Sequence, residues 1–180
     1  MGDEEEPPSG LALVRDLVNT LDVESGHDAL AGPDGPAEFS RTHGLKLGPA
    51  DVAEVRELRE ALRAVCLAHA GATLPEERAG ELERLFGTAA LVVSFDDAGR
   101  ASLRPAVEAT GVRGLLGRVA VAVAVAEAEG TWQRLKACET HDCLWAYYDR
   151  SPAGRRRWCS MQVCGSRAKM RTYRRKKQQQ

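Results

Sequence analysis

The sequence predicts an α+β fold in which a mainly helical N-terminal domain carries a small β-hairpin and precedes a short, cysteine-rich C-terminal module. Three observations support this prediction. Much of the first 130 residues repeats apolar side chains at helical spacing, one stretch is β-branched and interrupted by a glycine-bearing turn, and four of the five cysteines lie after residue 137. Because 43% of the 180 residues are hydrophobic, the chain can bury a core, which argues against disorder throughout.

The chain opens with an acidic, proline-bearing stretch, so we expect residues 1–8 to be a disordered acidic tail. A helix is expected to follow, with Ser9 as its candidate N-cap. The apolar side chains after this serine repeat at helical spacing: Leu11, Val14, Leu17, Val18 and Leu21. Residues 26–36 hold three glycines and two prolines, which predicts a loop.

The strongest helical pattern spans residues 49–70. Pro49 suits the first helical position, and Gly71 suits the end of the helix. Between them runs one apolar stripe: Val52, Val55, Leu58, Leu62, Val65 and Cys66. Since Cys66 lies on this stripe, we expect it to be a core residue and not a ligand or nucleophile.

Another helix is predicted over residues 75–86, with Leu82 and Leu85 facing inward. The next segment changes character. Residues 90–95 and 101–107 are two short extended runs on either side of a glycine-bearing turn, which is the pattern of a β-hairpin.

The most apolar segment lies within residues 112–129. Valine and alanine alternate over 119–126, which also suits a strand, but the length and alanine content favour a helix that ends at Gly130. This run of eight apolar residues is the longest in the chain, whereas a membrane helix needs about 18. The first residues are acidic, unlike a secretory signal. We therefore expect a soluble, cytoplasmic protein with no membrane partner.

The N-terminal 130 residues contain no recognisable catalytic arrangement. His27, His43 and His69 are isolated, the glycines lack the spacing of a phosphate-binding loop, and no nucleophile is paired with a base in a known motif. We predict that the chain is not an enzyme.

Charge divides the chain into two parts. Residues 132–180 carry a net charge of +10, whereas residues 1–131 carry −11. This asymmetry predicts a segment that binds a polyanion, attached to an acidic body. Alternatively, the two parts attract and neutralise each other.

The basic part holds a paired cysteine pattern, C-x4-C-x15-C-x4-C, made by Cys138, Cys143, Cys159 and Cys164. Two short pairs separated by a longer insert are typical of a tetrahedral metal site, and soft thiolates select zinc over magnesium or calcium. Four cysteines fill the shell, so we predict one structural Zn²⁺ that supplies much of the module's folding free energy. Disulfides or a redox switch remain an alternative. His141, inside the first pair, is expected to be a surface residue.

Within this module, residues 132–137 and 144–148 are predicted strands, 150–157 a loop and 165–177 a terminal helix. Cys164 falls at the expected start of that helix. The arrangement is that of a treble-clef or ribbon-like zinc finger. We accordingly expect domains over residues 9–130 and 131–177, with a tail over 178–180.

Several segments resemble known families. Residues 138–143 (CETHDC), 149–151 (DRS), 156–161 (RRWCSM) and 164–169 (CGSRAK) are similar to the CGNR-type zinc finger of bacteria. Residues 11–22 (LALVRDLVNTLD) resemble the start of the ABATE domain that usually precedes it. The resemblance extends from about Leu11 to about Tyr173. It implies a stress-induced transcription regulator with the four cysteines as zinc ligands.

Two positions depart from the family pattern. Ser166 stands where the namesake motif has asparagine, and residues 151–155 differ from the usual asparagine- and serine-bearing stretch. Neither change removes a thiolate ligand, so zinc binding is expected to survive. Contacts to a partner through that asparagine would change.

The leading functional hypothesis is a DNA-binding regulator that uses the basic finger. The candidate contact residues form a loop cluster and a helix face: Arg155, Arg156, Arg157, Arg167, Lys169, Arg171, Arg174 and Arg175. Arginine and lysine bind phosphates, and arginine also recognises guanine edges. The alternative for this helix is a solvated surface that docks on the acidic body.

Two further hypotheses remain open. RNA binding would use stacking surfaces, for which the candidates are Trp145, Tyr147, Tyr148 and Trp158, although these aromatics also suit the small core of the finger. A third hypothesis is an interaction or sensor module, in which the acidic domain binds a small molecule or a protein. This role is compatible with the first, since a regulator needs an input.

Overall fold

The structure is a computed structural model that describes residues 7–8, 10–32, 34–106 and 110–178. Most of the expected acidic tail, the candidate cap Ser9 and the end of the expected C-terminal tail lie outside these residues. None of the helices in these ranges is both long and apolar enough to cross a membrane.

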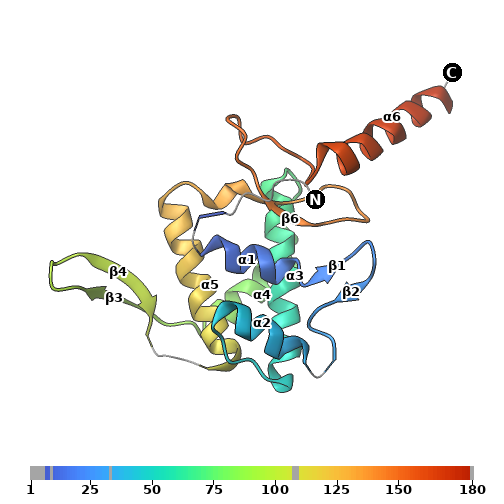
Figure 1. Cartoon of the computed structure of the whole chain (residues 1–180). Helices are drawn as coiled ribbons and strands as arrows, with labels where there is room; N and C mark the ends of the chain where they lie inside the picture. Colours follow the sequence, from blue (N-terminus) through green and yellow to red (C-terminus); the bar gives the residue numbers. More distant parts are fainter. Residues whose placement is uncertain (1–6, 9, 33, 107–109, 179–180) are drawn as a thin grey trace.

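Five helices and a 3-10 turn form the body of the molecule (Figure 1). Their bounds are α1 (Leu11–Val18), α2 (Gly35–His43), η1 (Pro49–Asp51), α3 (Val52–His69), α4 (Glu76–Phe86) and α5 (Gly111–Ala128). Helix α1 packs against both α3 and α5. The core between these helices is aliphatic and includes Val14, Leu17, Leu58, Leu62, Leu115, Leu116 and Val119. The prediction of a mainly helical domain is confirmed.

The N-terminal region differs from expectation in two places. Helix α1 ends at Val18, before Leu21, because the chain turns at residues 19–20 and then pairs β1 (Leu21–Asp22) with β2 (His27–Asp28). Helix α2 begins inside the segment expected to be a loop. Its proline lies in the first turn, where a missing N–H is tolerated.

The predicted hairpin is present as β3 (Leu91–Phe95) and β4 (Ala101–Pro105), paired antiparallel. It extends away from the body beside α5 (Figure 1). Of the body elements, α5 is the helix against which both strands pack.

The C-terminal module is built onto the same core. After a 3-10 turn, η2 (Trp132–Arg134), strand β5 (Leu135–Ala137) pairs with β6 (Ala146–Tyr148). Strand β5 packs on α3 and β6 packs on α1, and Leu135, Ala137 and Ala146 are fully buried in the common core. The module therefore shares the hydrophobic core of the helical domain.

The chain ends in helix α6 (Ser166–Gln178), which projects away from the body (Figure 1). A single π-helical turn, η3 (Met161–Gly165), leads into it without a break. Cys164 thus lies in this wider turn, and α6 itself begins two residues later, at Ser166. The Ser160 side chain caps the turn by accepting a hydrogen bond from the Val163 N–H.

Candidate metal centre and basic helix

The structure brings the four predicted cysteines together. Cys138 follows β5, Cys143 ends the next turn, Cys159 lies on the long loop and Cys164 lies in the π turn. Their sulfur atoms all lie within 4.8 Å of one another. The Sγ atoms of Cys143 and Cys159 are 3.6 Å apart, and those of Cys159 and Cys164 are 3.7 Å apart.

These distances fit a tetrahedral zinc site. With Zn–S bonds of about 2.3 Å, the edge of the tetrahedron is about 3.8 Å. No disulfide links the cysteines. Cys66, by contrast, is buried on α3 in the hydrophobic core, as its place on the apolar stripe predicted.

The first cysteine pair lies in a tight turn held by the helical domain. Both the Cys143 and the Leu144 N–H groups donate to the Thr140 carbonyl, at 2.8 and 3.2 Å. Leu144 has a positive φ of 53°, an uncommon conformation for leucine. The Leu144 carbonyl accepts a hydrogen bond of 3.0 Å from the buried Arg63 side chain of α3, which stabilises this turn.

The electrostatics of the cluster favour a cation. Hydrogen bonds from Cys143 and Cys159 lower the pKa of Cys138 far below the ordinary value for a thiol. The same contact with Cys138 raises the pKa of Cys143 to about 12, and contacts with Cys138 and Cys143 raise that of Cys159 as well. One thiolate in the cluster thus opposes ionisation of the others. A divalent cation between the sulfurs removes this conflict, because metal ligation deprotonates thiols.

A buried carboxylate organises the loop between the cysteine pairs. Asp149 is fully buried and accepts hydrogen bonds from Lys136 Nζ at 3.0 Å, Ser151 Oγ at 2.6 Å and the Arg156 N–H at 2.8 Å. Burial alone would raise the pKa of this carboxyl, but these donors outweigh it and lower the pKa to about 2. Lys136, itself only 4% exposed, also donates to the Gly154 carbonyl.

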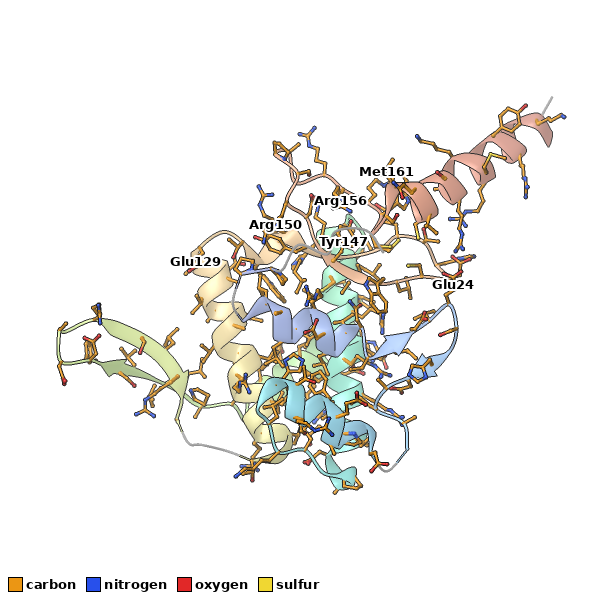
Figure 2. The ribbon with its side chains drawn as sticks, in the orientation of Figure 1. Glu24, Glu129, Tyr147, Arg150, Arg156 and Met161 are labelled. Atoms are coloured by element: carbon orange, nitrogen blue, oxygen red, sulfur yellow. The ribbon has the colours of Figure 1, made fainter. Side chains whose placement is uncertain are left out.

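The three loop arginines have different surroundings. Arg156 is half-buried, lies 5.1 Å from the Tyr147 ring centroid and donates to the Cys159 carbonyl (Figure 2). Arg157 forms an ion pair with Glu139 at 2.5 Å. Arg155 is exposed. Of this predicted cluster, Arg156 thus has a role inside the module that the sequence pattern did not reveal.

Helix α6 gathers three of the predicted contact residues on one side. Arg167, Arg171 and Arg174 line an open hollow together with Gln162, Val163, Ser166 and Met170. Lys169 is exposed and is not among the lining residues. The side chain of Arg175 lies outside the part of the chain that the structure describes.

The base of α6 contacts the body through a surface ion pair. Arg167 donates to Glu24 at 2.8 Å, from α6 to the turn between β1 and β2, and Figure 2 shows Glu24 on that turn. Both side chains are about half exposed. Part of the basic helix therefore does dock on the acidic body, as the alternative hypothesis anticipated, while Arg171 and Arg174 remain exposed.

The candidate stacking aromatics are not exposed. Tyr147 is 8% exposed and donates its hydroxyl to the Arg156 carbonyl, and Trp145, Tyr148 and Trp158 are half-buried. His141 is exposed, beside Asp142. These positions agree with the interpretation of the aromatics as core residues and of His141 as a surface residue.

Sequence reasoning missed the residues that join the module to the body. Asn19 donates through Nδ2 to the Ala146 carbonyl at 2.9 Å and accepts from the Ala146 N–H at 2.7 Å, so its side chain pairs with β6 as a strand edge would. Arg63 donates to carbonyls on both sides of the junction. Asn19 lies within the family-like segment at the start of the chain, which was the available signal; nothing in the helical pattern marked Arg63.

The fold and the cluster together define a helical domain whose core continues into a four-cysteine zinc-finger module. Residues 134–177 match the CGNR zinc finger, and residues 11–137 match the ABATE family, described as "Putative stress-induced transcription regulator". The chain belongs to the ABATE family and carries a C-terminal CGNR zinc finger. The two matches overlap on β5, the strand that both units share. A comparison with curated proteins found no significant match.

Proposed function

We propose that this chain is a cytoplasmic, DNA-binding transcription regulator whose finger holds one structural zinc ion. The observation that carries the proposal is the arrangement of α6, in which Arg167, Arg171 and Arg174 share one side of a helix that projects beyond the four-sulfur cluster. The family description of transcription regulators supports the same function.

The proposed zinc ion has a structural role. Four thiolates complete a tetrahedral shell and leave no open position at which the metal could activate water. The ion would join the turn at Cys138 and Cys143 to the loop at Cys159 and to the π turn that begins α6. We accordingly propose that the chain acts by binding and catalyses no reaction.

Helix α6 suits a DNA groove in size and charge. Its 13 residues span about 20 Å, and the major groove, about 12 Å wide, admits a helix. Arg171 and Arg174 are exposed and available to phosphates or guanine edges, and Met170 lines the same hollow. Because the candidate stacking aromatics Trp145, Tyr147, Tyr148 and Trp158 are buried or half-buried, base stacking on them has less support than groove binding.

We further propose that the acidic N-terminal domain supplies the regulatory input by binding a ligand or a protein. Support comes from the junction, where α1 and α3 hold the finger directly. Asn19 bonds to β6, and Arg63 bonds to the turn of the first cysteine pair. A shift of either helix would therefore displace a zinc-ligating segment.

The test is the salt dependence of binding to a fluorescent DNA duplex by the zinc-loaded chain. Each phosphate contact contributes about −0.9 to the slope of log affinity against log salt. Replacing Arg167, Arg171 and Arg174 with alanine should weaken binding and reduce the slope by about 2.7. Arg41→Ala, at an exposed arginine of α2, is the matched control and should change neither quantity.

Two results would contradict the proposal. One is a salt slope that the triple substitution leaves unchanged; the other is binding confined to single-stranded RNA. Recovery of bound genomic fragments, repeated with Cys159→Ser and Cys164→Ser, then tests whether the finger has a sequence preference.

A further inference from the structure

One face of the β3–β4 hairpin is entirely apolar. Side chains alternate along a strand, so three cross-strand pairs share this face: Leu91 with Pro105, Val93 with Leu103 and Phe95 with Ala101. The opposite face carries Val92, Ser94, Ser102 and Arg104. Phe95 is 72% exposed and Val93 is 58% exposed, which is unusual for large apolar side chains gathered on one surface.

The hairpin is rooted on the outward side of α5. A Cβ on Gly117 would lie 3.0 Å from the Pro105 Cβ, so the end of β4 packs closely on this glycine. Gly117 lies opposite Leu115, Val119 and Ala126, which face the core. From this root the hairpin extends outward, beyond the body (Figure 1).

The outward side of α5 is itself apolar. Val121, Ala124, Val125 and Ala128 lie on the same side of the helix as Gly117, and residues 119–126 contain no polar side chain. Val125 is 38% exposed. Over residues 119–126 α5 is apolar on every side, and a helical stretch of this kind normally has a partner all round. The chain thus exposes two apolar surfaces, the hairpin face and the outward side of α5.

We propose that these two surfaces form the interface between two copies of this chain, with each hairpin lying across the outward side of α5 of the other copy. A two-fold axis buries both surfaces of both copies at once, since such an interface is reciprocal. The hairpin face is uncharged, and Arg113, in line with Gly117, lies one turn before the apolar stretch of α5. The proposal goes beyond DNA binding and does not depend on it.

The area of the two surfaces distinguishes this arrangement from a simpler one, in which only the two hairpins pack on each other. Two strands of five residues present a face about 17 Å long and about 10 Å wide. The apolar stretch of α5 from Gly117 to Ala128 adds a side about 18 Å long and of similar width. In projection, each copy therefore offers about 350 Å², which is of the same order as the accessible surface of about 800 Å² that each partner buries in a stable complex. Packing of the hairpins alone would cover only about 170 Å².

The experiment measures the mass of the zinc-loaded full chain, without DNA, by light scattering at 5–200 μM (about the range in which standard interfaces associate). We expect twice the 19.5 kDa of one chain. Phe95→Glu on the hairpin and Val125→Glu on α5 should each return the mass to that of one chain, with unchanged helical circular dichroism. Ser102→Glu, on the polar face of the same hairpin, is the matched control and should remain dimeric.

Several outcomes would overturn the proposal. One is that the native chain has the mass of a single copy at the highest concentration. Another is that Phe95→Glu dissociates the dimer whereas Val125→Glu does not, which would mean that the hairpins pack on each other and not on α5. Binding of a single-copy chain to neutral phospholipid vesicles would assign the face to a membrane surface. If a charged variant unfolds, hydrogen exchange of the native chain decides: residues 91–105 and 119–128 should gain protection with concentration, and equal protection at all concentrations contradicts the dimer.

Discussion

Replacing Asp149 with alanine is expected to destabilise the finger more than any substitution of an exposed carboxylate. The carboxylate is fully buried and is the partner of Lys136, which is only 4% exposed. Alanine leaves this ammonium group bonded to the Gly154 carbonyl without a carboxylate beside it, and the Arg156 N–H loses its acceptor. Removing one half of a buried ion pair costs about 3–5 kcal/mol.

The assay is urea unfolding of the zinc-loaded chain at neutral pH. The free energy of unfolding should fall by about 3–5 kcal/mol in Asp149→Ala. Asp97→Ala, at an exposed position in the hairpin turn, should change it by less than about 0.5 kcal/mol. Adding Lys136→Met to Asp149→Ala should restore much of the loss, because no unpaired charge is then buried.

Acid titration provides a second measurement on the same pair. The pKa of Asp149 is lowered to about 2 from its ordinary value of 3.8, so its contribution to stability is present above pH 3.8 and is lost as the pH falls through about 2. Between pH 3.8 and about 2, the free energy of unfolding of the native chain should therefore fall more steeply than that of the variant with both Lys136→Met and Asp149→Ala. A cost below about 1 kcal/mol for Asp149→Ala, or parallel acid curves for the two proteins, would refute the reasoning.

Three further predictions concern the cysteines and the junction. Thiol labelling of the native chain should modify four cysteines once the metal is chelated. The fifth, Cys66, should react only after unfolding, because burial raises its pKa to about 12. Labelling of Cys66 in the folded chain would contradict its place in the core. Asn19→Leu should lower the free energy of unfolding by about 2–3 kcal/mol, measured in urea, since both hydrogen bonds to Ala146 are lost; an unchanged value would show that the junction does not depend on them. Glu24→Gln should raise DNA affinity up to about five-fold at low salt, because Arg167 is released from its surface ion pair, and a lower affinity would contradict that role.

Strong periodicity explains which elements the sequence could predict. Helix α3 buries apolar residues at helical intervals, and in α4 the partly buried Leu82 and Phe86 pack on the core beside the buried Leu85, so local spacing identifies both helices. Length and alanine content identify α5. Helix α2 buries only Pro36, Phe39 and Ser40, so its stability comes from contacts that no local pattern records. One such contact is the hydrogen bond from the Leu47 N–H to Ser40 Oγ.

The cysteine spacing predicted the cluster, but the junction of the two units had no local signal. Asn19 and Ala146 are 127 positions apart, and their pairing depends on the complete fold. Net charge also overstated the basic surface of the finger. Lys136 is buried against Asp149 and Arg156 is half-buried against Tyr147, so these two cations hold the loop together.

The most direct measurement is a zinc titration of the metal-free chain, followed by the binding of a DNA duplex at low salt. If the four sulfurs hold one ion and that ion positions α6, DNA affinity should rise with added zinc and stop rising at one ion per chain. DNA affinity that is the same before and after zinc, or that keeps rising well beyond one equivalent, would contradict this account.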